Sequence, residues 1–340
     1  MDNLTHSLAG AVIGQLGLKK KTGLGMATLI IAANLPDIDA FAPLLGGHQH
    51  LAMRRGITHG PIAIAILPLI LTGIMLWFDG WQTRRGKRPA DRLPIHKGWL
   101  LALAYIGCLS HPALDWLNSY GIRLLEPFSS QWFYGDSIFI IDIWIWAAMI
   151  AGVWISRRRE KKGRDDWQRP AWISFAVICA YIFANGLITG KAETDTELAV
   201  TQRIGLKPDQ VVANPVPVTF WRREMLWQMG QGVDAKYGEG MFDLLDPEPF
   251  YWKGEWIEND ATQAMVDKAR RSDPDVDAFL FWSRMPVLQQ DKDAASEDGV
   301  TLNISDMRFR SPLVQDRFAI TTVIPNDAEP GAGETAKGDQ

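Results

Sequence analysis

The chain has 340 residues, 47% of them hydrophobic, and a formal net charge of −4 at pH 7. Its mean hydropathy of −0.06 resembles that of a soluble protein, but the average conceals two different halves. Up to Gly190 the chain is apolar and has 19 Lys and Arg against 12 Asp and Glu, whereas from Lys191 it has 16 against 27. This division argues against one globular core and favours a basic membrane part joined to an acidic soluble part. Cys108 and Cys179 both lie in apolar runs, which excludes a disulfide framework and a Cys-type zinc site.

The opening of the chain predicts a short helical hairpin. Residues 4–18 and 23–35 are apolar and rich in Gly and Ala, and the lysines at 19–21 separate them. Helices of about 13–15 residues are about 20–23 Å long, so full and partial crossing of the bilayer are both open. No basic residue precedes the first apolar run, so a secretory signal peptide is not expected.

Four further segments predict transmembrane helices, at residues 61–78, 98–118, 138–156 and 171–190. The connections between the segments alternate in charge. One side would hold 16 Lys and Arg, at 19–21, 84–97 and 157–169, and the other side only Arg54, Arg55 and Arg123. Basic loops stay in the cytoplasm, so we expect a multi-pass protein of the bacterial inner membrane whose C-terminal half is extracytoplasmic.

The second half predicts a small strand-rich α+β domain over residues 191–325. Residues 216–220, 278–282, 302–309 and 317–324 favour strands through their β-branched and aromatic side chains. Residues 246–249 and 272–277 are typical of turns or loops. Residues 326–340 are rich in Gly, Ala and acidic residues, which predicts a disordered tail. The predicted order is thus a membrane domain (1–190), the soluble domain (191–325) and this tail.

Residues able to bind metal occur in four short motifs and at one isolated position. They are Asn3-Leu4-Thr5-His6-Ser7, Asn34-Leu35-Pro36-Asp37-Ile38-Asp39, Arg54-Arg55-Gly56-Ile57-Thr58-His59-Gly60, Ser110-His111-Pro112-Ala113-Leu114-Asp115, and Asp142. The orientation set by the basic loops would bring every one of these positions to the outer side, at one level. Ionisable residues at such positions are costly and therefore functional candidates.

The residue types favour a divalent metal. Imidazole with carboxylate suits Zn²⁺ or Mn²⁺ better than Mg²⁺, and His111 and Asp115, four residues apart, share a helix face. We expect one or two ions, held by ligands drawn from seven residues. These are His6, Asp37, Asp39, His59, His111, Asp115 and Asp142.

Simpler roles remain open for several of these residues. Asp37 could cap a following helix, and Asp142 could pair with an Arg across the bundle. His48 and His50 fit loop positions better than ligand positions, and His96 falls in a basic cytoplasmic loop and is excluded.

The same motifs resemble the bacterial membrane-bound metal-dependent hydrolase family, the YdjM-like group. The resemblance covers about residues 1–190 and continues through residues 118–128. It implies a membrane-bound, metal-dependent hydrolase. Family members often have His-Arg-Gly where this chain has Arg54-Arg55-Gly56, so a ligand found there in relatives is missing here unless His50 replaces it.

The sequence therefore predicts hydrolysis of a phosphoester or similar ester in a lipid-linked or amphiphilic substrate. A metal-bound water would be the nucleophile, with Asp39 as general base. Arg54, Arg55 and Arg123 would bind an anionic substrate, and Arg55 would also take part in catalysis.

The alternative is a non-catalytic membrane protein in which a metal fixes the helices. Its C-terminal domain would bind a periplasmic partner through aromatic anchors. The same aromatics could instead form the domain core or lie at the membrane interface. The anchor candidates are Trp221, Trp227, Trp252 and Trp256. A transporter is a weaker option. Nucleic-acid binding is not expected, because anionic lipid and topology explain the basic loops, and the sequence does not define the oligomeric state.

Overall fold

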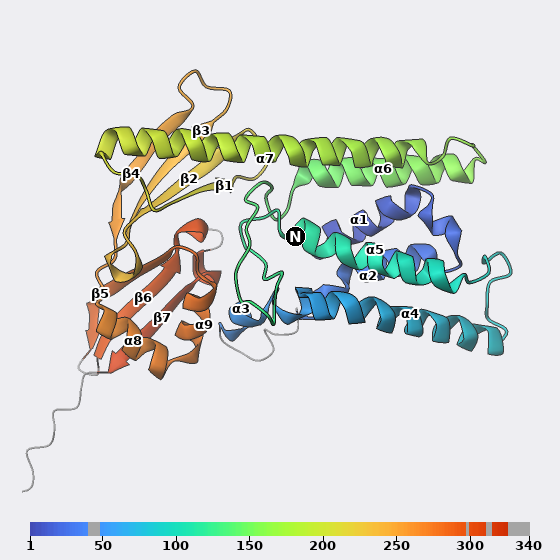
Figure 1. Ribbon diagram of the computed structural model, residues 1–340, viewed down its shortest axis with the longest axis horizontal. Helices are drawn as coiled ribbons and strands as arrows, with labels where there is room; N and C mark the ends of the chain where they lie inside the picture. The colour runs from blue at the N-terminus through green and yellow to red at the C-terminus, as the bar shows by residue number, and fades with distance from the viewer. Residues whose placement is uncertain (40–47, 297–298, 311–314, 326–340) are drawn as a thin grey trace, which may run out of the picture.

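The computed structural model describes residues 1–39, 48–296, 299–310 and 315–325. A helical part comes first and a strand-rich part follows (Figure 1). The helices of the first part are α1 (Asn3–Gln15), α2 (Gly25–Asn34), α3 (Gln49–Met53), α4 (Pro61–Arg84), α5 (Lys97–Asp115), α6 (Ile143–Lys161) and α7 (Arg169–Ile204). The predicted order, helices and then strands, is confirmed.

The first two helices form the predicted hairpin around the lysines, which lie in the 3-10 turn η1 (Leu18–Lys21). Asp2 caps α1 by accepting hydrogen bonds from the amides of Leu4 and Thr5. Helix α2 packs against both α1 and α5, and α4 packs on α5. Helix α6 packs between α1 and α7. The helices lie roughly side by side along the long axis of the molecule (Figure 1).

Two helices are long and apolar enough to cross a membrane, α4 and α7. Helices α5 and α6 form at the predicted segments and have 19 residues each. Neither is apolar enough over its whole length to count as a candidate span, because α5 has polar residues near its C-terminus and α6 ends in basic residues. The described chain thus has two candidate spans, and crossing by α5 and α6 stays a prediction.

Helix α7 passes the predicted domain boundary at residue 190 without a break. It runs beside α6 and then continues over the strands (Figure 1). Its second half packs Ile188 and Ala192 against Ala213, Met225 and Phe242 of the first sheet. One continuous helix therefore belongs to both parts of the molecule.

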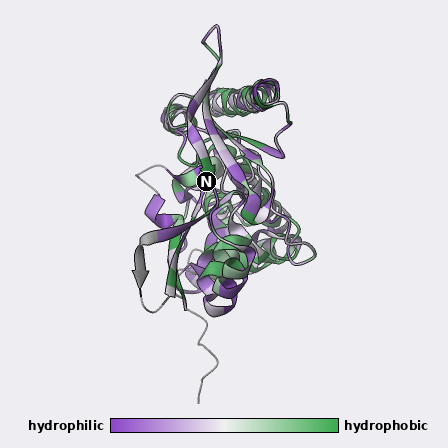
Figure 2. Ribbon diagram, turned by 90° about the vertical axis from the view of Figure 1, so that its left-hand side faces the viewer, coloured by the Kyte–Doolittle hydropathy of each residue, from purple (hydrophilic) through white to green (hydrophobic). Residues whose placement is uncertain are grey.

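The strand-rich part consists of two antiparallel sheets. The first has the order β1-β2-β3-β4 and the second β5-β6-β7. Their bounds are β1 (Gln210–Pro215), β2 (Arg222–Met229), β3 (Lys236–Asp243), β4 (Phe250–Glu258), β5 (Pro286–Ser296), β6 (Gly299–Asp306) and β7 (Ala319–Pro325). Helices α8 (Gln263–Ser272) and α9 (Pro274–Trp282) cover β7. From the sheet end, hydrophilic residues are spread over the strands (Figure 2).

Some predicted strands are wrong. Residues 216–220 form no strand, and residues 278–282 belong to α9, where Asp273 caps the helix and Pro274 opens it. Residues 272–277 are largely helical, whereas 302–309 and 317–324 fall mostly in β6 and β7. Residues 246–249 form a turn as predicted. The predicted tail, 326–340, lies outside the described residues.

The two parts of the molecule share buried contacts. Leu51 and Tyr120 of the helical part join the core formed by Trp282, Phe279 and Leu302. The buried guanidinium of Arg223 donates to Thr189, to Asn185 and to the carbonyl of Ser137. The sheet part is therefore fixed against one end of the helix bundle.

Candidate metal centre

Four buried side chains converge where the helix bundle meets the sheet part. Asp37, His59, His111 and Asp115 each present one ligand atom, and these atoms lie within 4.8 Å of one another. Asp37 and His59 lie in short 3-10 turns, and His111 and Asp115 lie in the last turns of α5, so chain segments far apart in sequence meet here. We call these four residues the metal cluster.

The two histidines of the cluster face each other with their Nε2 atoms. His59 Nε2 lies 3.1 Å from His111 Nε2. Asp115 Oδ2 lies 3.6 Å from His59 Nε2 and 3.5 Å from His111 Nε2. Asp37 Oδ1 lies 4.0 Å from His59 Nε2 and 3.6 Å from His111 Nε2. Two imidazole nitrogens this close can share only one proton, whereas one cation can accept lone pairs from both rings and both carboxylates.

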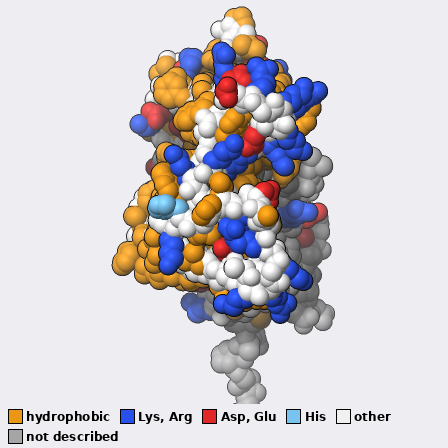
Figure 3. All heavy atoms as spheres, turned by 90° about the vertical axis from the view of Figure 1, so that its right-hand side faces the viewer, with side chains coloured by type: hydrophobic (Ala, Val, Ile, Leu, Met, Phe, Trp, Pro, Cys, Tyr) orange, Lys and Arg blue, Asp and Glu red, His pale blue; other side chains and the backbone are white. Residues whose placement is uncertain are grey.

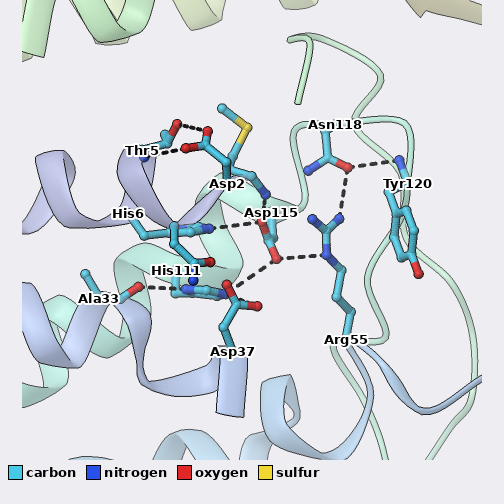
Figure 4. A network of polar contacts seen from close by, with 12 residues as sticks. Asp2, Thr5, His6, Ala33, Asp37, Arg55, His111, Asp115, Asn118 and Tyr120 are labelled. Carbon is cyan, nitrogen blue, oxygen red and sulfur yellow. Dashed lines mark hydrogen bonds and ion pairs between the residues drawn. The ribbon is translucent and has the colours of Figure 1, made fainter. Parts of the chain in front are cut away.

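Hydrogen bonds behind each ring fix this orientation. His111 Nδ1 donates to the carbonyl of Ala33 at 2.7 Å (Figure 4). His59 Nδ1 lies 2.9 Å from Thr58 Oγ1, and that hydroxyl donates to Asp39 Oδ2 at 2.9 Å. In the neutral form of each ring, Nδ1 therefore carries the proton and Nε2 directs its lone pair into the cluster.

Charge and burial favour a neutral His59 and an ionised Asp37. Burial lowers the pKa of His59, which favours the neutral imidazole that binds a metal. Burial raises the pKa of Asp37, but hydrogen bonding to His111 and the charge of that ring outweigh it and hold the pKa below its usual value. Asp37 is therefore a carboxylate, the form that coordinates cations.

Asp39 lies behind His59 and not among the four ligands. Its Oδ2 accepts hydrogen bonds from Thr58 and from the backbone amide of Arg55 at 2.8 Å, and lies 3.5 Å from His59 Nδ1. The two carboxylates of the Asp37-Ile38-Asp39 run thus contact opposite sides of one imidazole ring.

His6 borders the cluster. Its ring stacks on His111 with centroids 3.7 Å apart, and its Nε2 lies 3.3 Å from Asp115 Oδ1 (Figure 4). Both ring nitrogens are buried and neither makes a well-aligned hydrogen bond. The N-terminal amine of Met1 also contacts Asp115. His6 is therefore an additional donor beside the four, and the choice between one and two ions stays open.

The guanidinium of Arg55 brings positive charge to the edge of the metal cluster. Its Nε lies 3.0 Å from Asp115 Oδ2, and its Nη1 donates to Asn118 Oδ1 at 3.0 Å (Figure 4). The guanidinium also covers the ring of Tyr120 at 4.6 Å. Its backbone has φ +53°, a strained conformation for this residue type that is common at functional sites.

The other predicted site residues lie outside the cluster. Arg123 is engaged with Glu126 and with the carbonyl of Ala52, and Arg54 makes no contact with the four ligands. Asp142 caps α6 through the amides of Trp144 and Ile145 and accepts from Tyr181. His50 stacks on His48 and is not one of the four ligands.

Sequence reasoning missed the residues that hold the ligands in place. Thr58, which contacts His59, lies inside one of the four motifs, and Asn118, which holds Arg55, lies in the segment 118–128, but nothing in their spacing indicated these partners. The Ala33 carbonyl is a backbone group and left no mark in the sequence.

A helical bundle with candidate membrane spans and a buried His/Asp cluster defines the class: an integral membrane protein with a potential divalent-metal site. The chain belongs to the YdjM inner membrane protein family, whose model matches residues 1–192. No curated protein and no solved structure matches the chain.

Proposed function

We propose that this protein is a membrane-bound, metal-dependent hydrolase. Its substrate would be a phosphoester or related ester of a lipid-linked or amphiphilic molecule at the outer face of the inner membrane. The observation that carries the proposal is the pair of histidines whose Nε2 atoms face each other at 3.1 Å, with Nδ1 of each ring directed to a hydrogen-bond acceptor.

The donor set fits a metal. Asp37, His59, His111 and Asp115 would hold it, and the buried ring nitrogens of His6, which make no well-aligned hydrogen bond, are further donors beside them. Mixed imidazole and carboxylate ligands favour Zn²⁺ or Mn²⁺ over Mg²⁺. When bound, such an ion supplies Lewis acidity and lowers the pKa of a coordinated water.

The protein side chains have separate tasks in this proposal. Arg55 holds Asp115 in place and supplies positive charge for an anionic substrate group. Asp39 acts through Thr58 and His59, so the geometry favours a positioning role over general-base catalysis. Arg123 holds loops together and is a weaker candidate for substrate binding.

Metal content is the first test. Detergent-purified protein should contain stoichiometric Zn²⁺ or Mn²⁺ by elemental analysis, and His111→Ala should lose it. His48→Ala is the matched control, because its ring lies beside His50 and Phe279 and is not one of the four ligands, so metal content should stay unchanged. Wild-type protein that stays metal-free after reconstitution would refute the metal site.

Turnover is the second test. Metal-stripped protein should be inactive on a panel of lipid phosphates, and reloading should restore activity. Protein that binds metal but hydrolyses none of the panel would contradict the hydrolase and leave a structural metal.

We also propose the orientation that the charge bias predicts. Lys and Arg gather at the end of the bundle opposite the sheets (Figure 3), and we call this the basic end. With the basic end in the cytoplasm, the metal cluster and the sheets face outward. In intact cells, a membrane-impermeant maleimide should label Glu255→Cys and not Lys87→Cys, both exposed positions. Labelling of Lys87→Cys alone would reverse the orientation.

One observation supports the alternative, a partner-binding protein with a structural metal. Strand β4 is an edge strand, and it exposes Tyr251 and Trp256 by 41% and 40%. Trp227, by contrast, is buried and contacts the half-buried Trp252, so Trp227 belongs to the domain interior. If Trp256→Ala abolished a cellular phenotype that His111→Ala left intact, the alternative would replace the hydrolase.

A further inference from the structure

A groove lies at the basic end, between α1, α2 and α6, far along the helices from the metal cluster. Its volume is about 380 Å³, within the range of sites that hold small organic ligands. Its floor is apolar and consists of Ala11, Met26, Ile30 and Val153. We call it the α1/α6 groove.

The rim of the groove carries more positive than negative charge. Lys19, Arg157 and Lys161 line it together with a single acid, Glu160. Glu160 is already paired with Lys19 and with Lys20. Among the described residues, Arg157 and Lys161 pair with no carboxylate in the structure, and both are exposed. The unbalanced charge is thus concentrated on these two residues.

Arg157 and Lys161 are positioned to act on one ligand. They are four residues apart in α6, so their side chains lie on the same helix face. The corner beside them is well packed: the buried Ser156 hydroxyl lies 2.6 Å from the carbonyl of Trp167 and 3.2 Å from Gln15 Oε1, and Lys19 lies over the Trp167 ring. Two cations therefore stand at the mouth of an apolar groove with fixed walls.

We propose that the α1/α6 groove binds a phospholipid with an anionic headgroup. An acyl chain would lie against the apolar floor, and the headgroup phosphate would contact Arg157 and Lys161. Basic pockets between membrane helices on the cytoplasmic side bind such headgroups, and long basic side chains reach the headgroup layer from a helix end. The proposal does not depend on metal binding or hydrolysis; it rests on the helices lying in a membrane with the basic end at the cytoplasmic face.

The test compares lipid binding by the full chain in detergent, using native mass spectrometry with added phosphatidylglycerol or phosphatidylcholine. Wild-type protein should retain phosphatidylglycerol preferentially. Arg157→Ala/Lys161→Ala should weaken its binding by roughly 30-fold, the effect of two basic residues near a headgroup. Arg84→Ala/Lys87→Ala is the matched control, because it removes two exposed charges from the basic end outside the groove, and it should bind like wild type.

A second variant tests the apolar floor. Val153→Trp fills the groove without changing charge and should also reduce phosphatidylglycerol binding. If Arg157→Ala/Lys161→Ala and Arg84→Ala/Lys87→Ala lost the same amount of phosphatidylglycerol affinity, the proposal would be overturned in favour of general electrostatic attraction. Competition by free glycerol phosphate as strong as by the intact lipid would overturn it too, because the floor would then contribute nothing.

Discussion

Two aspartates separated by one residue have different tasks at the metal cluster. Asp37 Oδ1 faces the Nε2 atoms of both histidines, whereas Asp39 Oδ2 lies on the Nδ1 side of His59. The first can bind a metal directly, and the second can affect it only through the imidazole. Such outer carboxylates tune ligand orientation and basicity.

Asp39→Asn should therefore weaken metal binding without abolishing it. We expect about a 10- to 100-fold loss of affinity, the usual effect of removing an outer partner of a ligand histidine. Competition with a chelator of known affinity would measure it. Asp79→Asn is the control, because Asp79 pairs with Arg88 and Arg92 in the basic end and should leave the affinity unchanged. Loss of metal even at saturating concentration would show that Asp39 is itself a ligand.

Much of the site could be predicted at the level of single residues, but not its geometry. Residue type and the alternation of basic loops indicated all four members of the cluster. They could not separate Asp37 from Asp39, because residues 35–39 continue α2 in tight turns that sequence spacing did not predict. Nor could they indicate that Asp142 caps α6, since a capping Asp and a ligand Asp look alike in sequence.

At the scale of helices, close packing between α2 and α5 sets the position of His111. Gly107 lies one turn before His111 on α5. A Cβ there would lie 2.7 Å from the Ala32 Cβ and 2.8 Å from the Leu29 carbonyl oxygen, too close without a shift of the backbone. The carbonyl that holds His111, that of Ala33, is on the same stretch of α2.

Gly107→Leu should separate these helices and weaken metal binding together with stability. Overpacking of this kind costs about 1–3 kcal/mol. Thermal unfolding and metal titration would both report the change. Gly73→Leu on α4 has open space around its Cβ position and is the control. Unchanged metal affinity in Gly107→Leu would mean that α2 and α5 do not position His111 by close contact.

Helices were easier to predict than strands, for physical reasons. Apolar runs between lysines or basic loops defined α1, α2 and α4 to α7 because membrane segments must be apolar over most of their length. The strands β6 and β7 were indicated by β-branched residues. Strand β3 contains Gly238 and Gly240, whose missing side chains make room for Trp227 and Phe250, so its composition resembles that of a loop.

At the scale of the whole molecule, a buried ion pair fixes the sheet part to the loops of the bundle. Arg308 donates to both oxygens of Asp306 at 2.8 Å and to the carbonyl of Ser119 at 2.7 Å. Ser283 and the amide of Arg284 also donate to Asp306. Burial raises the pKa of Asp306, but the charge of Arg308 and these hydrogen bonds outweigh it and hold the pKa below its ordinary value.

The depressed pKa gives stability a defined pH dependence. The unfolded carboxyl titrates near pH 4, so the contribution of Asp306 is complete above that pH and is lost as pH falls through the lower, folded value. Asp306→Asn should be destabilised by about 3 kcal/mol at pH 7, because Arg308 is left buried and unpaired. The difference in Tm from wild type should shrink between pH 4 and pH 2. A difference that stayed constant over this range would contradict the assignment.

The order of these pieces along the chain has a consequence for biosynthesis. All four ligands precede residue 116, whereas the residues that close over the neighbouring loops, Trp282 and Arg308 among them, are translated last. Domains form in the order in which they emerge from the ribosome. We expect the ligands to meet before the sheets close over these neighbouring loops, so metal loading would be easiest on the nascent chain.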